Sequence, residues 1–123
     1  MTIYLSHSRN FDYQTELYQI LQNSSLAQKH KIILPHQNSS EPYPTKELFL
    51  GKKCDLVIAE VSFPGTGQGI ELGWADILNI PIICIYRKDN KIAGSLKIIS
   101  NSFVEYENLT DILVEIEQQI SVL

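Results

Sequence analysis

The chain has 123 residues, of which 44% are hydrophobic and 20% charged, which is typical of one globular domain and excludes a disordered or fibrous chain. Fourteen acidic residues against ten basic ones give a net charge of −4, and no basic stripe favours binding to nucleic acid or an anionic membrane. No apolar run approaches the roughly 20 residues that span a bilayer, and no signal-peptide pattern is present. We therefore expect a single cytoplasmic domain over residues 1–123.

Two cysteines and three histidines are scattered along the chain without metal-binding spacing. Cys54 and Cys84 form no C-x-x-C pair, and we interpret them as small core residues. His7, His30 and His36 show no i, i+4 pairing and stand near no cysteine cluster. We therefore expect neither a metal site nor a cofactor.

Apolar, β-branched runs alternate along the chain with segments of helical periodicity. The helical segments repeat apolar residues at i, i+4, i+7 and i+8, whereas the runs at 55–61 and 81–86 are typical of strands covered on both faces. In chain order the prediction is strand 2–6, helix 13–21, strand 31–34, loop 36–44, helix 45–53, strand 55–61, glycine-rich loop 62–68, helix 69–79, strand 81–86, a short segment 93–99, strand 103–106 and helix 109–120.

This alternation predicts right-handed βαβ units and an α/β fold. Five strands in a chain of this length favour a flavodoxin-like, doubly wound parallel sheet of order 2-1-3-4-5 with helices on both faces. Such sheets bind ligands beyond the carboxyl ends of the strands, near the switch between the first and third strands. The prediction therefore places a site at loops 6–10 and 62–68.

Three glycines stand at alternate positions after the third predicted strand: Gly65, Gly67 and Gly69. Their backbone N–H groups, together with a helix N-terminus, suit the oxygens of a phosphate or ribose. A flexible strand-to-helix turn is the alternative. The loop is not a Walker A motif, because no Gly-Lys-Ser/Thr follows, and it is a poor dinucleotide fingerprint, because Ile70 occupies the last glycine position.

Two glutamates near this loop are candidate site residues. Glu71 falls in the first turn of the predicted helix, where a carboxylate either complements the helix dipole or serves as a glycosyl nucleophile. Glu60 lies near the carboxyl end of a buried strand, where a charge must reach a cleft, solvent or a partner. We keep Glu60 as a secondary candidate.

The segments Asp-Leu-Val-Ile-Ala-Glu-Val-Ser at 55–62 and Gly-Gln-Gly-Ile-Glu-Leu-Gly at 67–73, with Pro64 between them, resemble the signature of the nucleoside 2-deoxyribosyltransferase superfamily. Within it, the likeness is to the small 2′-deoxynucleoside 5′-monophosphate N-hydrolases. It is strong over 47–86 and extends over the whole chain. The resemblance implies a flavodoxin-like fold, a homodimer or larger homo-oligomer, no cofactor, and a nucleotide or nucleoside as the small-molecule partner.

The resemblance also implies catalytic roles for three residues. Glu71 matches the family nucleophile, which forms a glycosyl ester with the sugar, and Tyr4 matches a first-strand tyrosine that orients it. Glu47 stands where the family usually has an aspartate that contacts or protonates the leaving base.

Further residues match positions that bind the substrate. Ser8 matches a loop serine on the 5′-phosphate, and Arg9 beside it adds positive charge. Gly67 and Gly69 match the backbone cradle, and Ser95 aligns with a serine that reaches the neighbouring subunit's phosphate site.

One substrate position departs from the family. Gly65 replaces an aspartate of the transferases and a serine of the hydrolases, and Thr66 is the residue that could compensate. The leading hypothesis is an N-glycosidase that cleaves a (deoxy)nucleoside 5′-monophosphate or nucleoside through a glycosyl-glutamate intermediate. The alternatives are a 2-deoxyribosyltransferase, an inactive nucleotide-binding module, and an interaction domain without a ligand.

Overall fold

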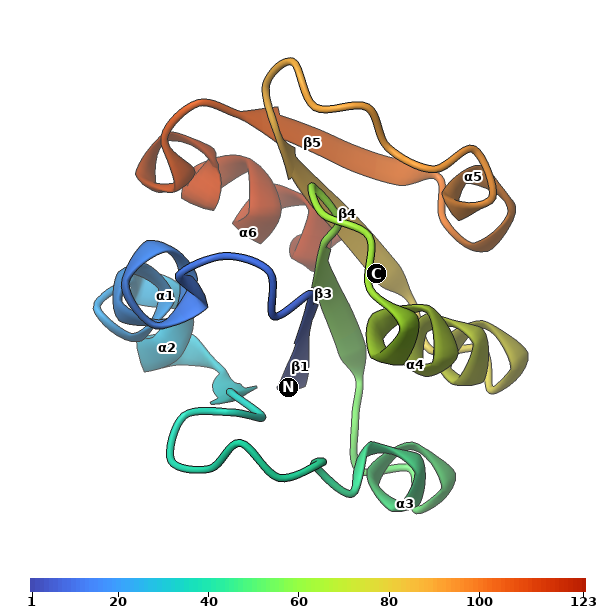
Figure 1. Cartoon of the computed structure of the whole chain (residues 1–123). Helices are drawn as coiled ribbons and strands as arrows, with labels where there is room; N and C mark the ends of the chain where they lie inside the picture. The colour runs from blue at the N-terminus through green and yellow to red at the C-terminus, as the bar shows by residue number, and fades with distance from the viewer.

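The computed structural model describes all residues, 1–123, and contains one parallel sheet of five strands. The strand order is β2-β1-β3-β4-β5 (Figure 1), as the alternation of strands and helices predicts. The strands are β1 (Thr2–His7), β2 (Lys31–Ile33), β3 (Leu56–Glu60), β4 (Ile82–Arg87) and β5 (Ser102–Tyr106). The flavodoxin-like fold class is thereby confirmed.

Helices cover both faces of the sheet (Figure 1). One face carries a π-helical turn η1 (Gln14–Tyr18), α1 (Gln19–Gln22), α2 (Ser25–Lys29), a 3₁₀ turn η2 (Leu109–Ile112) and α6 (Leu113–Ser121). The other face carries α3 (Thr45–Leu50), α4 (Thr66–Ile77) and α5 (Leu96–Ile99). None of these helices has the length and apolar content needed to cross a membrane.

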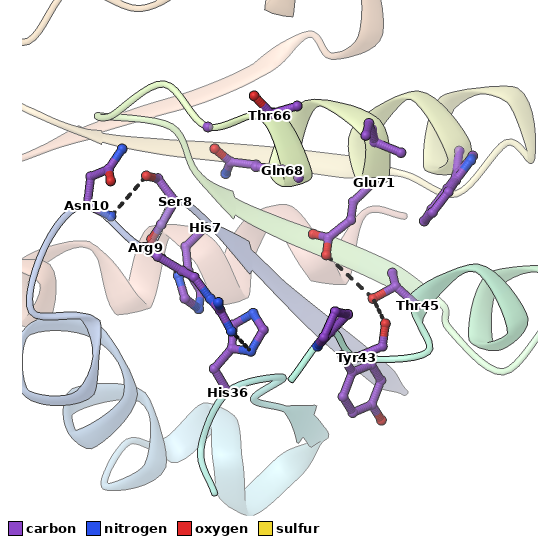
Figure 2. Close-up of a pocket in the computed structure, with 15 residues that line it drawn as sticks. His7, Ser8, Arg9, Asn10, His36, Tyr43, Thr45, Thr66, Gln68 and Glu71 are labelled. Atoms are coloured by element: carbon purple, nitrogen blue, oxygen red, sulfur yellow. Dashed lines mark hydrogen bonds between the residues drawn. The ribbon is translucent and has the colours of Figure 1, made fainter. Parts of the chain in front are cut away.

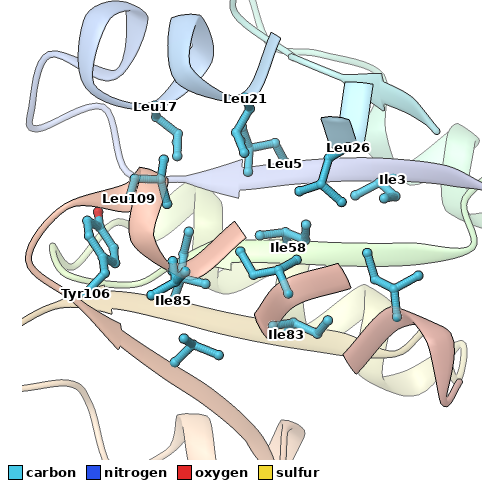
Figure 3. Packing of buried hydrophobic residues seen from close by; sticks show 14 of the residues in the cluster. Ile3, Leu5, Leu17, Leu21, Leu26, Ile58, Ile83, Ile85, Tyr106 and Leu109 are labelled. Carbon is cyan, nitrogen blue, oxygen red and sulfur yellow. The ribbon is translucent and has the colours of Figure 1, made fainter. Parts of the chain in front are cut away.

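Side chains alternate between two hydrophobic cores along each central strand. Ile3 and Leu5 of β1 enter the core beneath α1, α2 and α6, where they meet Ile58 and Ile85 (Figure 3). Tyr4, between them, faces the core beneath α3 and α4. Both cysteines are buried and unpaired, as predicted. The same alternation decides which side chains of β1 reach the site.

Helix α4 begins at Thr66, three residues earlier than the periodicity predicts. Gly65 is its extended N-cap, and the Gly69 N–H donates to the Gly65 carbonyl oxygen at 3.1 Å. The glycine-rich loop therefore ends at Gly65, and Glu71 lies in the second turn rather than the first. Because the dipole effect fades beyond the first turn, Glu71 needs other partners.

Two other helical predictions were also incomplete. The helix predicted over 13–21 is divided between η1 and α1, and α2 was not predicted. Leu26 is the only buried hydrophobic residue of α2, so no apolar periodicity marks it. The last helix begins as η2, where the Asn108 side chain accepts a hydrogen bond from the Thr110 N–H at 3.2 Å.

Candidate active site

A cavity of about 490 Å³ opens where the carboxyl ends of β1 and β3 meet (Figure 2). The loop after β1 and the start of α4 form two of its walls, and the loop before α3 forms a third. The two predicted loops therefore do lie together at the switch point of the sheet.

Glu71 reaches into this cavity from α4, and its carboxylate is held by hydroxyl groups of β1 and α3. The Tyr4 hydroxyl donates to Oε1 at 2.8 Å, and the Ser6 hydroxyl donates to Oε2 at 2.9 Å. The Thr45 hydroxyl lies 3.5 Å from Oε1. Tyr4 and Ser6 are two residues apart on one strand, so both point to the α4 side of the sheet.

The proton directions in this group follow from the partners. Tyr4 is fully buried, and burial followed by the adjacent Glu71 charge raises the pKa of its hydroxyl far above the usual value. Tyr4 therefore stays protonated, and its hydroxyl donates a hydrogen bond to Glu71. The Thr45 hydroxyl is 2.8 Å from the Tyr4 oxygen. Because the only Tyr4 proton is already used, Thr45 is the donor of this pair, and its single proton is shared between the Tyr4 oxygen and the more distant Glu71 Oε1.

Burial raises the pKa of the Glu71 carboxyl, and the hydrogen bonds from Tyr4, Ser6 and Thr45 act in the opposite direction. Donors aimed at a carboxylate stabilise its charged form. Glu71 is also the only carboxylate that lines the cavity. The arrangement therefore offers one nucleophilic carboxylate and lacks the second carboxyl group that retaining and inverting glycoside hydrolases both use.

Small and polar groups line the end of the cavity near β1. The Ser8 hydroxyl donates to the Pro64 carbonyl oxygen at 3.3 Å, as does the Asn10 side-chain amide at 3.2 Å. A Cβ on Gly65 would lie 3.3 Å from the Ser8 Cβ, so glycine permits the close approach of the two loops. The first N–H groups of α4 have no partner within the helix, and Thr66 and Gly67 bring them to this end of the cavity.

Arg9 lines the cavity but is bound to the loop that precedes α3. Its guanidinium donates to His36 Nδ1 at 3.0 Å and to the Ser40 carbonyl oxygen. Arg9 thus connects the loop after β1 with the loop after β2 (Figure 2).

Besides Glu60, four sequence-predicted residues do not line this cavity: Tyr4, which contacts Glu71, and Glu47, Gly69 and Ser95. Glu47 is exposed on α3, so the structure does not bring it to Glu71. The Gly69 N–H donates to the Gly65 carbonyl oxygen within α4 and is not available to a ligand. Only the N–H groups of the first turn of α4 are therefore left for the predicted backbone cradle. Ser95 precedes α5 and lines a neighbouring cavity, which shares Gly65 with the main one.

The secondary candidate Glu60 also lies away from the cavity. It is fully buried and shares the sheet face of Ile58, opposite to Glu71. Its carboxylate accepts hydrogen bonds from the Ser62 N–H at 2.6 Å, the Ser62 hydroxyl at 3.0 Å and the Tyr106 hydroxyl. Glu60 therefore orders the start of the β3–α4 loop and does not line the cavity.

The sequence analysis missed several residues that line the cavity or contact Glu71. Ser6 could have been found from strand alternation, because it follows Tyr4 by two positions. Thr45 had no such signal, since its approach depends on the path of the loop before α3. Tyr43 and Trp74 also line the cavity and form its aromatic end. Tyr43 lies away from Ser8 and Asn10 (Figure 2), and Trp74 follows Glu71 by about one turn of α4, away from Thr66. No group of three or more His, Cys, Asp or Glu side chains lies in metal-binding proximity.

Fold and site together define a flavodoxin-like domain with a hydroxyl-held glutamate at the switch point of its sheet. No protein-family model matches the chain. Curated proteins named "Putative 2′-deoxynucleoside 5′-phosphate N-hydrolase 1" do match it. The one from Syntrophotalea carbinolica is 31% identical over 64 residues, which are 50% of this chain and 45% of the relative. The one from Methanosarcina mazei is 32% identical over 78 residues, which are 57% and 47%. The chain thus spans less than half the length of these relatives.

The structure of Clostridium botulinum CMP N-glycosidase, BcmB, superimposes with a TM-score of 0.68. The match covers 95% of this chain and 99% of that one at 20% sequence identity, so it concerns the fold. With the names of the curated relatives, it confirms the resemblance that the motifs of β3 and α4 indicate.

Proposed function

We propose that this protein is an N-glycosidase that cleaves the bond between base and sugar in a nucleoside 5′-monophosphate. The observation that carries the proposal is the geometry of Glu71, the only carboxylate of the cavity, which accepts hydrogen bonds from Tyr4 and Ser6. The names of the curated relatives and of the structural neighbour support a nucleotide as substrate.

The reaction proceeds in two displacements. A Glu71 carboxylate oxygen attacks the anomeric carbon, the glycosidic C–N bond breaks, and its electron pair leaves with the base, which takes up a proton. A water molecule then attacks the same carbon, loses a proton and releases the carboxylate. The two inversions retain the configuration of the sugar.

The hydroxyl groups around Glu71 serve both displacements. They stabilise the charged carboxylate before attack and again when it departs from the sugar. Their orientation is set before substrate arrives, because Tyr4 is fully buried and also hydrogen-bonded to Thr45 at 2.8 Å. Preorganised donors of this kind cost little reorganisation in the transition state.

The two ends of the cavity suit the two ends of a nucleotide. The loop with Ser8 and Asn10, with the first turn of α4, offers hydroxyl, amide and backbone N–H donors for a 5′-phosphate. The opposite end offers the Tyr43 and Trp74 rings to a base. Glu71 lies between them, where the sugar would bind.

The same intermediate permits transfer of the sugar to a second base in place of water. The absence of a side chain at Gly65 disfavours a standard transferase, which carries an aspartate at that position according to the resemblance. Adding a free base to the reaction separates the two activities. A new nucleotide indicates transfer, and free base alone indicates hydrolysis.

The test is chromatographic detection of free base from a panel of ribo- and deoxyribonucleoside 5′-monophosphates and the matching nucleosides. We expect the wild type to release base and Glu71→Gln to lose at least about a thousandfold of kcat/KM, equivalent to roughly 4 kcal/mol of transition-state stabilisation. Glu115→Gln is the matched control, because Glu115 is exposed on α6, across the sheet from the cavity. Mass spectrometry of acid-quenched reactions should find the sugar phosphate on the Glu71 peptide.

Two outcomes contradict the proposal. Nucleotide binding without base release, unaffected by Glu71→Gln, would instead identify an inactive nucleotide-binding module. Full activity of folded Glu71→Gln would remove Glu71 from the chemistry.

A further inference from the structure

His7 is a buried histidine that lines the cavity but has no part in the chemistry of Glu71. It is the last residue of β1, and 7% of its surface is exposed. Strand alternation turns its ring away from Tyr4 and Ser6 and toward η1, where it packs against Tyr13 and Tyr18 at ring-centroid distances of 4.5 and 5.2 Å.

The tautomer of His7 follows from its two partners. Its Nδ1 is 2.7 Å from the Ser8 carbonyl oxygen, which only accepts, so Nδ1 carries a proton. Burial lowers the pKa of His7 to about 4, so the ring is neutral at pH 7 and Nε2 is an acceptor. The Tyr18 hydroxyl, 2.6 Å from Nε2, therefore donates to it.

Tyr18 extends this chain of hydrogen bonds to the next loop. Its oxygen accepts the backbone N–H of His36 at 3.1 Å. The direction is the same at each step, from the His36 N–H through the Tyr18 hydroxyl and the His7 ring to the Ser8 carbonyl. A chain with consistent donor directions is cooperative, and each member is satisfied.

The two ends of this hydrogen-bond chain, Ser8 and His36, belong to loops that have different roles in the proposed function. Ser8 is in the loop that would receive the phosphate. His36 begins the loop 36–44, which brings Pro42 and Tyr43 to the aromatic end of the cavity. The hydrogen-bond chain thus fixes the backbone of the loop after β1 relative to the backbone of the loop after β2.

We infer that His7 and Tyr18 are positioning residues that set the distance between the phosphate end and the base end of the cavity, and thereby favour a 5′-monophosphate over a nucleoside. The inference rests on the proposed function. A nucleotide bridges both loops and needs their relative placement, whereas a nucleoside does not reach the loop of Ser8.

Tyr18→Phe tests this inference with the loss of a single oxygen. It removes two hydrogen bonds of the chain and keeps the buried ring. We expect KM for the best-cleaved 5′-monophosphate to rise roughly three- to tenfold, as for the loss of about one net hydrogen bond. The change should appear in KM rather than kcat, because the Glu71 hydroxyls are untouched, and it should be smaller for the matching nucleoside.

Tyr13→Phe is the matched control, since Tyr13 packs on the same histidine but its hydroxyl makes no hydrogen bond in the structure. His7→Asn is a second variant, whose shorter amide can replace the bond to Ser8 but not the bond to Tyr18. It should reproduce the Tyr18→Phe phenotype. Melting temperatures of all variants establish that they fold.

Binding measurements keep the inference separate from the proposed function. Trp74 is the only tryptophan and lines the cavity, so its fluorescence reports binding of CMP or another 5′-monophosphate in the inactive Glu71→Gln background. If the wild type binds without releasing base, the proposed function fails, and the ratio of Kd values for Tyr18→Phe and Tyr13→Phe still decides the inference. Equal effects of these two substitutions, or equal losses with nucleotide and nucleoside, would overturn it. Absence of both binding and cleavage would overturn both proposals.

Discussion

At the residue scale, the state of Glu71 depends on hydroxyl groups rather than on a neighbouring positive charge. Its pKa is raised by burial, and the donors Tyr4, Ser6 and Thr45 lower it. In the proposed reaction Glu71 must be ionised to attack, so activity should fall as the pH falls through the pKa of Glu71. The acid limb of the pH profile therefore reports how far these hydroxyl groups lower the pKa of Glu71.

Tyr4→Phe removes the donor to Glu71 and should raise the pKa of the carboxyl further, because burial then meets less opposition. The acid limb of the pH profile of kcat/KM should move to higher pH by about one unit, as expected for a lost hydrogen bond to a charged group. At pH 7 the activity should drop at least about tenfold. The measurement is kcat/KM between pH 4 and 9, with Tyr13→Phe as control. A lower plateau with an unmoved acid limb would show that Tyr4 does not tune this ionisation.

At the element scale, the two loops that form the site are also joined outside the cavity. The Phe11 and Phe63 rings stack with centroids 5.2 Å apart, and the Arg87 guanidinium carbon lies 5.3 and 5.0 Å from their centres. Arg87 also forms an ion pair with Glu16 of η1 at 2.6 Å. We call Phe11, Phe63 and Arg87 the loop clamp.

Arg87→Met keeps the apolar stem of the side chain but removes the charge from the loop clamp. We expect the free energy of unfolding to fall by about 1–2 kcal/mol, from two cation–π contacts and a partly exposed ion pair. Glu16→Gln removes the ion pair alone and should cost less than about 1 kcal/mol. Urea denaturation of both variants checks the difference. Equal losses would assign the whole effect to the ion pair.

The elements that sequence reasoning predicted well are those whose pattern is set by burial on both sides. β3 and β4 are continuous apolar runs because helices cover both faces of the sheet. The start of α4 was missed because Gly67 and Gly69 suggest a loop. In the structure the helix begins directly after its N-cap Gly65, whose carbonyl oxygen accepts the first hydrogen bond of the helix, from the Gly69 N–H. Helix α2 was missed because tertiary packing of Leu26, rather than a repeating pattern, stabilises it.

The same reasoning explains which site residues were predicted. Glu71 was proposed from the family motif and lies in the cavity, although its assumed place in the first helical turn was wrong. Glu60 looked equally suitable in sequence, but strand alternation turns it to the opposite face. Tyr4 was proposed from the resemblance, whereas Ser6 was missed, although the same alternation places it on the face of Tyr4. Thr45, the first residue of α3, could be placed only by the fold, because its approach to Glu71 depends on the path of the preceding loop.

At the scale of the whole molecule, the exposed side of α4 is the region that bears on assembly. Ile70, Gly73 and Ile77 are all exposed there and recur at helical spacing, and Ile77 is 79% exposed. The resemblance implies a homodimer, and Ser95 aligns with a serine that reaches the neighbouring subunit. We therefore propose that a second copy of this chain packs on this side of α4.

Ile77→Glu tests this arrangement, because burying an unpaired carboxylate at an apolar interface is strongly unfavourable. Light scattering should give the wild type twice the 14.0 kDa chain mass and the variant the mass of one chain. Val114→Glu is the control, since Val114 is 65% exposed on α6, across the sheet, and this variant should remain a dimer. A monomeric wild type would show that there is no such interface. A dimer that tolerates Ile77→Glu but not Val114→Glu would place the interface on the other side of the sheet. If Ile77→Glu is monomeric and also loses nucleotide affinity without losing its fold, the second copy completes the phosphate end of the cavity, as the alignment of Ser95 implies.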